Sequence, residues 1–170
     1  SSASAGILNF ENARFNMVRP GIITYGYMPD GSIENSIGLK PATKLISHVV
    51  YVKEVEKGTA ISYSRTYIAE GKRKIATVPL GYADGIRRLL SNKGKVYING
   101  KYAPIVGNVC MDNFMIDITG IDVKVGDTVY IWDNEHVHIE EIAKICGTIN
   151  YEILCGISSR VKRIYIKERE

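Results

Sequence analysis

Short stretches of alternating apolar and polar residues follow one another from Ala42 onward, a pattern typical of β-strands. These stretches are rich in β-branched residues and tyrosine, which suit a pleated, half-buried sheet. Asn99-Gly100 predicts a hairpin turn, because both central residues of such a turn take positive φ. The predicted strands span 45–55 (ending at Lys57-Gly58), 74–80, 95–106 (folded at the hairpin), 114–118, 125–132 and 159–167.

One segment breaks the β pattern and predicts a helix over 138–147. Ile139, Ile142, Ala143 and Cys146 recur at helical spacing, and two glutamates suit the positive end of the helix. Gly147 suits the position just after its last turn. We therefore expect a mainly β fold, an antiparallel, closed or partly closed β-barrel with one short helix. Closure of a sheet removes its exposed edges.

Residues 1–40 lack a regular period and are rich in Gly, Ser, Asn and Pro, so they are interpreted as loops and fragments of another domain. The chain begins Ser-Ser-Ala-Ser-Ala-Gly without an initiator Met. We expect it to be a processed protein or a piece of a longer one.

Composition excludes several classes of partner. The net charge is only +4 and no run of five Lys or Arg exists, which argues against a polybasic tail for nucleic acid or membrane. The three cysteines lie in no CxxC pair and no His stands at ligand spacing, so we expect no metal site. Reduced thiols, no apolar stretch of membrane-spanning length and no signal peptide favour the cytoplasm.

No catalytic triad, Walker loop or GxGxxG motif is present, and the three histidines have no nucleophilic partner in the pattern. The unusual feature is the number of tyrosines, eleven. Tyr63, in Ile-Ser-Tyr-Ser-Arg-Thr-Tyr, and Tyr82, in Gly-Tyr-Ala-Asp-Gly, stand at predicted strand ends. From the pattern alone they are ordinary amphipathic residues with hydroxyls in water.

Five blocks, however, resemble alanine racemases in order and in spacing, and together they cover nearly the whole chain. Ordered blocks are far more specific than any single motif. They are Val18-Arg-Pro-Gly-Ile22 with Tyr25-Gly26, the segments 61–67, 79–85 and 104–113, and Ile149-Asn-Tyr-Glu152 with Arg160-Val161.

The resemblance implies a two-domain enzyme of fold type III that depends on pyridoxal 5'-phosphate (PLP). Residues 1–40 then correspond to the end of an α/β barrel of the TIM type, and residues 41–170 to the carboxy-terminal β-domain. Such enzymes interconvert L- and D-alanine with two bases, a lysine and a tyrosine, for bacterial peptidoglycan in the cell wall. The lysine that binds PLP covalently lies far upstream in the family and no lysine here matches it, so the chain alone is expected to be inactive.

The resemblance also assigns roles around the substrate. Tyr63 matches the tyrosine base, and Met111 matches the residue whose backbone N–H binds the substrate carboxylate. Tyr82 and Arg88 match residues that line the narrow substrate entrance. Asn108 departs from the pattern, because many members carry Arg there, and this puts the charge of the outer entrance in doubt.

Five further residues match cofactor contacts: Ser4, Gly21, Ile22 and Tyr151 at the phosphate, and Arg19 at the pyridine nitrogen. Arginine only donates hydrogen bonds, so it leaves that nitrogen unprotonated and the ring a weaker electron sink. Tyr151 also favours alanine over serine, because relatives that prefer serine carry a smaller polar residue there.

The family's active site is shared between the subunits of a homodimer, so the resemblance implies the same partner here. Two alternatives stay open. The chain could serve a racemase of serine or another small amino acid, or it could be a stand-alone β-barrel binding module, for example one that binds RNA. The absence of a strip of aromatic and basic residues argues against RNA binding.

Overall fold

The computed structural model describes residues 1–29 and 37–166. It divides the chain into two compact units, Ser1–Thr43 and Lys44–Glu170. Among the described residues, no helix has both the length and the apolar character needed to cross a membrane.

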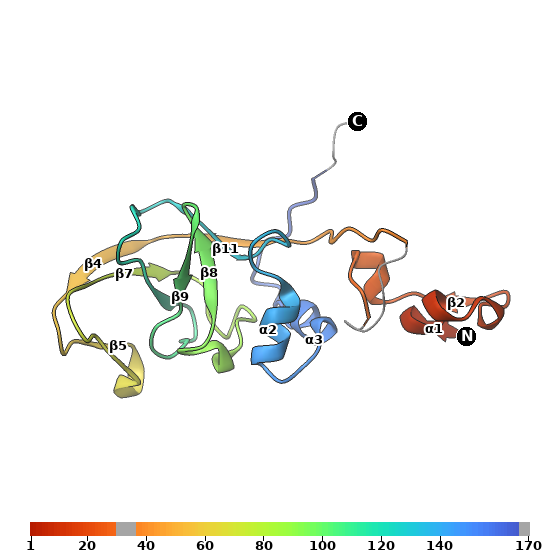
Figure 1. Cartoon of the computed structure of the whole chain (residues 1–170), viewed down its shortest axis with the longest axis horizontal. Helices are drawn as coiled ribbons and strands as arrows, with labels where there is room; N and C mark the ends of the chain where they lie inside the picture. The colour runs from red at the N-terminus through yellow and green to blue at the C-terminus, as the bar shows by residue number, and fades with distance from the viewer. Residues whose placement is uncertain (30–36, 167–170) are drawn as a thin grey trace. The chain divides into compact units, whose positions relative to one another are not determined.

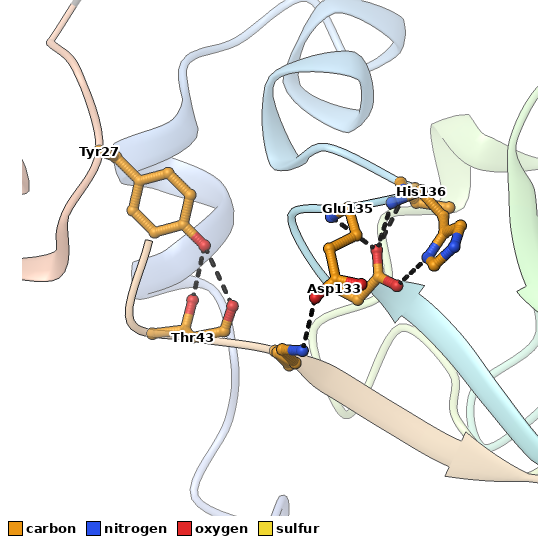
Figure 2. Close-up of polar contacts among 7 residues, drawn as sticks. Tyr27, Thr43, Asp133, Glu135 and His136 are labelled. Atoms are coloured by element: carbon orange, nitrogen blue, oxygen red, sulfur yellow. Dashed lines mark hydrogen bonds and ion pairs between the residues drawn. The ribbon is translucent and has the colours of Figure 1, made fainter. Parts of the chain in front are cut away.

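The first unit contains more regular structure than its sequence predicted. Its elements are β1 (Ser2–Ala3), α1 (Ser4–Asn9), η1 (Glu11–Ala13), β2 (Val18–Arg19) and η2 (Ile22–Tyr25). β1 and β2 pair in parallel, which requires a crossover connection, and α1 lies in that crossover. The sequence predicted only loops and fragments here, because elements this short leave no periodicity. The hydroxyl of Tyr27 donates to the Thr43 carbonyl oxygen (3.2 Å) and lies 2.8 Å from Thr43 Oγ1 (Figure 2).

The second unit is mainly β, and its described ladders are antiparallel, as predicted. One sheet has the order β10-β7-β4, a second β3-β11-β8-β9, and β5 pairs with β6 (Figure 1). The strands are β3 (Leu45–His48), β4 (Tyr51–Val55), β5 (Ala60–Ile61), β6 (Tyr67–Ile68), β7 (Arg73–Val78), β8 (Lys95–Ile98), β9 (Lys101–Pro104), β10 (Phe114–Asp117) and β11 (Thr128–Trp132).

The predicted long strand over 45–55 is divided between the two larger sheets. Its first part, β3, pairs with β11, and its second part, β4, pairs with β7. Between them the Val50 N–H donates to the Thr77 carbonyl (3.0 Å), and elsewhere an isolated bridge joins Ile105 to Ile116. The ladders nevertheless form separate sheets, so a closed barrel is not confirmed.

The hairpin prediction is confirmed, with Asn99 at φ 45° and Gly100 at φ 81° between β8 and β9. Alternate side chains of the strands point inward and form the core. The fully buried ones include Ile75, Val78, Val96, Ile98, Phe114, Ile116 and Val129.

The second unit contains two α-helices where one was predicted. α2 (Ile139–Ile145) lies where expected, and Gly147 after it has φ 65°. α3 (Asn150–Cys155) was missed, and it packs beside α2 (Figure 1). Two short 3-10 helices, η3 (Tyr63–Arg65) and η4 (Arg88–Leu90), complete the unit.

The strand predicted over 159–167 is wrong for the described residues 159–166, which form no strand. Ile164, Tyr165 and Ile166 are highly exposed. The alternation there does not correspond to a sheet, because no neighbouring strand pairs with this segment in the part of the chain that the structure describes.

Candidate active site

Four of the residues singled out in the sequence, Tyr63, Tyr82, Arg88 and Met111, line one open hollow of about 460 Å³ in the second unit. Tyr63, Tyr82 and Met111 come from three motif blocks that are well separated along the chain, and Arg88 follows shortly after the second of them. The fold therefore brings these blocks together in one place. The other residues that line the hollow are Asn108, Val109, Cys110, Asp112 and Asn113.

Tyr63 stands at the hollow on a strained turn, with its side chain 74% exposed. Ser62 has φ 65° and ψ −176°, a combination that is essentially restricted to glycine. Ser64 and Arg65 also have positive φ, at 62° and 51°. Each such residue costs about 1–3 kcal/mol and persists only where its surroundings hold it.

The loop 107–109 holds this turn. The buried Asn108 side-chain amide donates to the Tyr63 carbonyl (2.9 Å), and Ser62 Oγ donates to the Asn108 carbonyl (2.7 Å). Gly107 permits the close approach, since a Cβ there would lie 2.5 Å from the Ile61 carbonyl oxygen. Sequence reasoning placed Asn108 at the entrance and missed this contact with the backbone of Tyr63.

The backbone around Met111 is fixed by the neighbouring loop. The Tyr82 N–H donates to the Cys110 carbonyl (2.9 Å), and the Ala83 N–H donates to the Met111 carbonyl (3.0 Å). In the described residues, the Met111 N–H itself donates to no protein acceptor. A fixed N–H at the surface of a hollow is suited to receive a carboxylate.

Arg160 links the C-terminal segment to the same loops. Its Nη2 lies 2.7 Å from Asp112 Oδ1, and its Nε lies 3.5 Å from Asp84 Oδ1. The hydrogen bond to Asp112 and the charge of Asp84 raise the pKa of Arg160. Asp84 Oδ2 also accepts from the Gly81 N–H at 2.8 Å. The sequence marked Arg160 only as part of a block and did not predict this linkage.

Three of the four residues expected at the phosphate, Ser4, Gly21 and Ile22, lie in the first unit, and so does Arg19. Ser4 is buried, and its Oγ accepts from the Gly21 N–H at 2.9 Å. Ile22 begins η2, and Arg19 lies exposed in β2, with Nη2 3.3 Å from the Ser1 carbonyl oxygen. The Gly21 N–H is already bonded to Ser4, so the donors that fit a phosphate here are the Ser4 hydroxyl proton and the Ile22 N–H at the start of η2.

Tyr151 belongs to the second unit, where it lies half-buried in α3. The structure thus groups Ser4, Gly21 and Ile22 within one unit, and Tyr63, Tyr82, Arg88 and Met111 within the other.

Comparison with known proteins agrees with this geometry. Residues 42–165 match the family described as "Alanine racemase, C-terminal domain". The chain is 50% identical to the alanine racemase of Halothermothrix orenii over 97% of its own length. The chain belongs to the alanine racemase family. It spans 45% of the length of that relative.

Solved structures of alanine racemases share the fold of this family member. That of Clostridium difficile 630, in complex with cycloserine, is 47% identical with a TM-score of 0.92; the match covers 99% of this chain and 45% of that one. That of Bartonella henselae, with covalently bound pyridoxal phosphate, is 37% identical with a TM-score of 0.89. The match covers 97% of this chain and 46% of that one. Membership of this family argues against the alternative of a stand-alone β-barrel binding module.

Proposed function

We propose that this chain is the carboxy-terminal part of an alanine racemase that interconverts L- and D-alanine with PLP. The observation that carries the proposal is the meeting of Tyr63 and the unbonded Met111 N–H at one hollow. Together they supply a proton-transfer group and a carboxylate site, which racemisation of an amino acid requires.

The proposed domain division is residues 1–40 as the end of an α/β barrel and residues 41–170 as the β-domain. The parallel pairing of β1 with β2 across a helix supports it, because parallel strands joined by helices build such barrels. The family match that begins at residue 42 supports it too. We further propose that the two larger sheets form a partly closed barrel, supported by the shared run 45–55 and the bridge between Ile105 and Ile116.

Tyr63 transfers the α-proton on one face of the substrate, and the Met111 N–H holds the substrate carboxylate. A second base on the opposite face lets a proton leave on one side and return on the other without turning the substrate. That base is the family's lysine, which no lysine of this chain matches. The chain by itself therefore does not racemise alanine.

PLP, when bound, withdraws electrons from the α-carbon and so makes the α-proton easier to remove. Ser4, Gly21, Ile22 and Tyr151 would hold its phosphate, and Arg19 would contact its pyridine nitrogen. The Ser4 hydroxyl and the Ile22 N–H lie in one unit, and the hydrogen bond from Gly21 to Ser4 joins their segments, which supports this assignment.

Tyr82 and Arg88 narrow the entrance, and Tyr151 favours alanine over serine. The exposed side chains of Tyr82 and Arg88 at the hollow support the first assignment. The product, D-alanine, supplies cell-wall peptidoglycan. A cytoplasmic location is supported by the three cysteines, which are all free in the structure.

The partner we propose is a second copy of the enzyme. Tyr63 and Met111 act only when they face a barrel that carries the cofactor lysine. In the proposed homodimer that barrel belongs to the other subunit.

The test is Tyr63→Phe in the full-length enzyme, with exchange of the α-hydrogen in heavy water followed separately for each enantiomer of alanine. Loss of a positioned acid–base group lowers a rate by about 100-fold or more. We expect that loss for one enantiomer, while the other still exchanges through the opposite base. Tyr102→Phe is the matched control, because the Tyr102 hydroxyl donates to the His136 carbonyl (2.9 Å) and does not line the hollow. Small and equal losses for both enantiomers would show that Tyr63 is not the base.

A further inference from the structure

We infer that Asn108 is a positioning residue for Tyr63, holding the strained turn 62–65 so that the tyrosine keeps its place at the hollow. The inference rests on the proposed role of Tyr63 and names a residue that acts on it through the backbone.

Asn108 holds the turn in two directions at once. Its side-chain amide donates to the Tyr63 carbonyl (2.9 Å), and its own carbonyl accepts from Ser62 Oγ (2.7 Å). The Asn108 side chain is buried, with 7% of the residue exposed, so water does not readily replace these bonds.

Neighbouring residues fix Asn108 in turn. The Gly107 N–H donates to Asn92 Oδ1 (2.6 Å), and the Val109 N–H donates to Ser91 Oγ (2.9 Å). The amide of Asn92 also donates to Thr66 Oγ1 at 3.1 Å, at the far end of the same turn. The loop that contacts Tyr63 is thus anchored on both sides of Asn108.

The backbone strain of the turn 62–65 explains why the hydrogen bonds of Asn108 are needed. Ser62 occupies a backbone region that side chains avoid, and Ser64 and Arg65 add two more positive φ values. A free turn of this sequence relaxes to lower-energy backbone angles, and the side chain between them moves with it. Tyr63 is largely exposed, so its own side-chain packing does little to hold it.

Asn108→Asp tests the inference in the full-length enzyme, because it keeps the size of the side chain and removes the amide donor. Asn99→Gly is the matched control. The Asn99 amide also donates to a backbone carbonyl, that of Asp122 (2.8 Å), and glycine accepts the positive φ of that hairpin position.

Two measurements are made on each variant. Amide hydrogen exchange of residues 62–66, recorded without substrate, should speed up about tenfold in Asn108→Asp, which is the effect of losing roughly one buried hydrogen bond. Exchange of the substrate α-hydrogen should fall about 10- to 100-fold for the enantiomer that depends on Tyr63 and stay near wild type for the other. Asn99→Gly should change neither.

The two proposals fail in different ways. If Tyr63→Phe gives the asymmetric loss and Asn108→Asp gives an equal loss for both enantiomers, or no loss, the positioning role is overturned and the proposed function stands. If Tyr63→Phe gives no asymmetry, the role of Tyr63 fails and the inference fails with it, whatever the amide exchange shows. If Asn108→Asp does not fold, Asn108→Ser decides, because it removes the amide donor without adding a charge. The same asymmetric loss supports the inference, and wild-type behaviour overturns it.

Discussion

The buried carboxylate of Asp133 holds the turn that leads from β11 towards α2. Its Oδ1 accepts from the N–H groups of Glu135 (3.2 Å), His136 (2.9 Å) and Val137 (3.1 Å), and its Oδ2 lies 2.6 Å from His136 Nδ1 (Figure 2). Burial raises the pKa of Asp133, but the hydrogen bonds from the His136 side chain and from the three N–H groups outweigh it and lower the pKa to about 2. The His136 ring also stacks on Tyr97, with 3.6 Å between ring centroids.

Asp133→Ala should lower the free energy of unfolding at pH 7 by about 2 kcal/mol, from a pKa displaced by roughly two units. Because the folded pKa lies below the ordinary value of 3.8, the carboxylate stabilises the fold above about pH 4. That contribution is lost as the pH falls towards 2. Urea unfolding at several pH values measures both effects.

The difference in the free energy of unfolding between wild type and Asp133→Ala should therefore become smaller as the pH falls from 4 to 2. Asp122→Ala is the control, because Asp122 is exposed. The difference in its free energy of unfolding from wild type should vary little with pH. A difference for Asp133→Ala that stays constant down to pH 2 would contradict the role given to its charge.

At the scale of elements, Gly81 allows the loop after β7 to pack directly against the backbone of the loop before β10. A Cβ on Gly81 would lie 2.1 Å from the Met111 carbonyl oxygen and 2.4 Å from that of Cys110. Both atoms belong to the backbone, so the loop itself must shift to make room. That loop carries the N–H proposed to bind the substrate carboxylate.

Gly81→Ala should therefore weaken alanine binding and lower kcat/KM of the full-length enzyme by about 10- to 100-fold, the effect of misplacing a binding group by about 1 Å. Gly71→Ala is the matched control, because a Cβ at Gly71 meets no atom within 4 Å. Steady-state kinetics in both directions are the measurement. Wild-type kcat/KM in Gly81→Ala would mean that the loop position does not matter to binding.

The elements that the sequence predicted correctly are those with a strong local pattern. Short apolar runs bounded by turn residues identified β7 and β10, Asn99-Gly100 identified the hairpin, and the apolar face of α2 identified that helix. α3 was missed because its six residues are too few to establish a period. The break in the run 45–55 was missed because it depends on which strands lie beside it, and local alternation does not encode that.

The candidate site was likewise predicted only in part: the sequence identified its residues but not the bonds between them. The resemblance gave residues that the fold does gather at one hollow, such as Tyr63 and Met111. The bonds that hold them, from Asn108 to Tyr63 and from Arg160 to Asp112, join residues far apart in the chain. No local motif predicts such contacts, because they arise only when the sheets bring the loops together.

For the whole molecule, the central question is whose barrel Tyr63 faces. Co-expression of a full-length chain without the cofactor lysine and a second chain with Tyr63→Phe gives mixed dimers. If each site is built from two subunits, a mixed dimer has one site with both defects and one with neither. We expect activity to recover towards half the wild-type value per mixed dimer.

The two parent variants, each expressed alone, give the baseline for this measurement. Mixed dimers can be isolated with two different affinity tags. Absence of recovery in isolated mixed dimers would mean that each chain builds its own site, which would contradict the proposed partner.

The division of the run 45–55 between two sheets also affects how the protein is made. β4 can pair with β7 soon after both leave the ribosome, but β3 must wait for β11, whose Thr128 pairs with His48 although 80 residues separate them in the chain. Contacts between such distant residues form slowly, and an unpaired strand edge invites aggregation in the meantime. We therefore expect the nascent chain to fold poorly at high expression rates, and slower synthesis or chaperones to raise its yield more than changes at the active site.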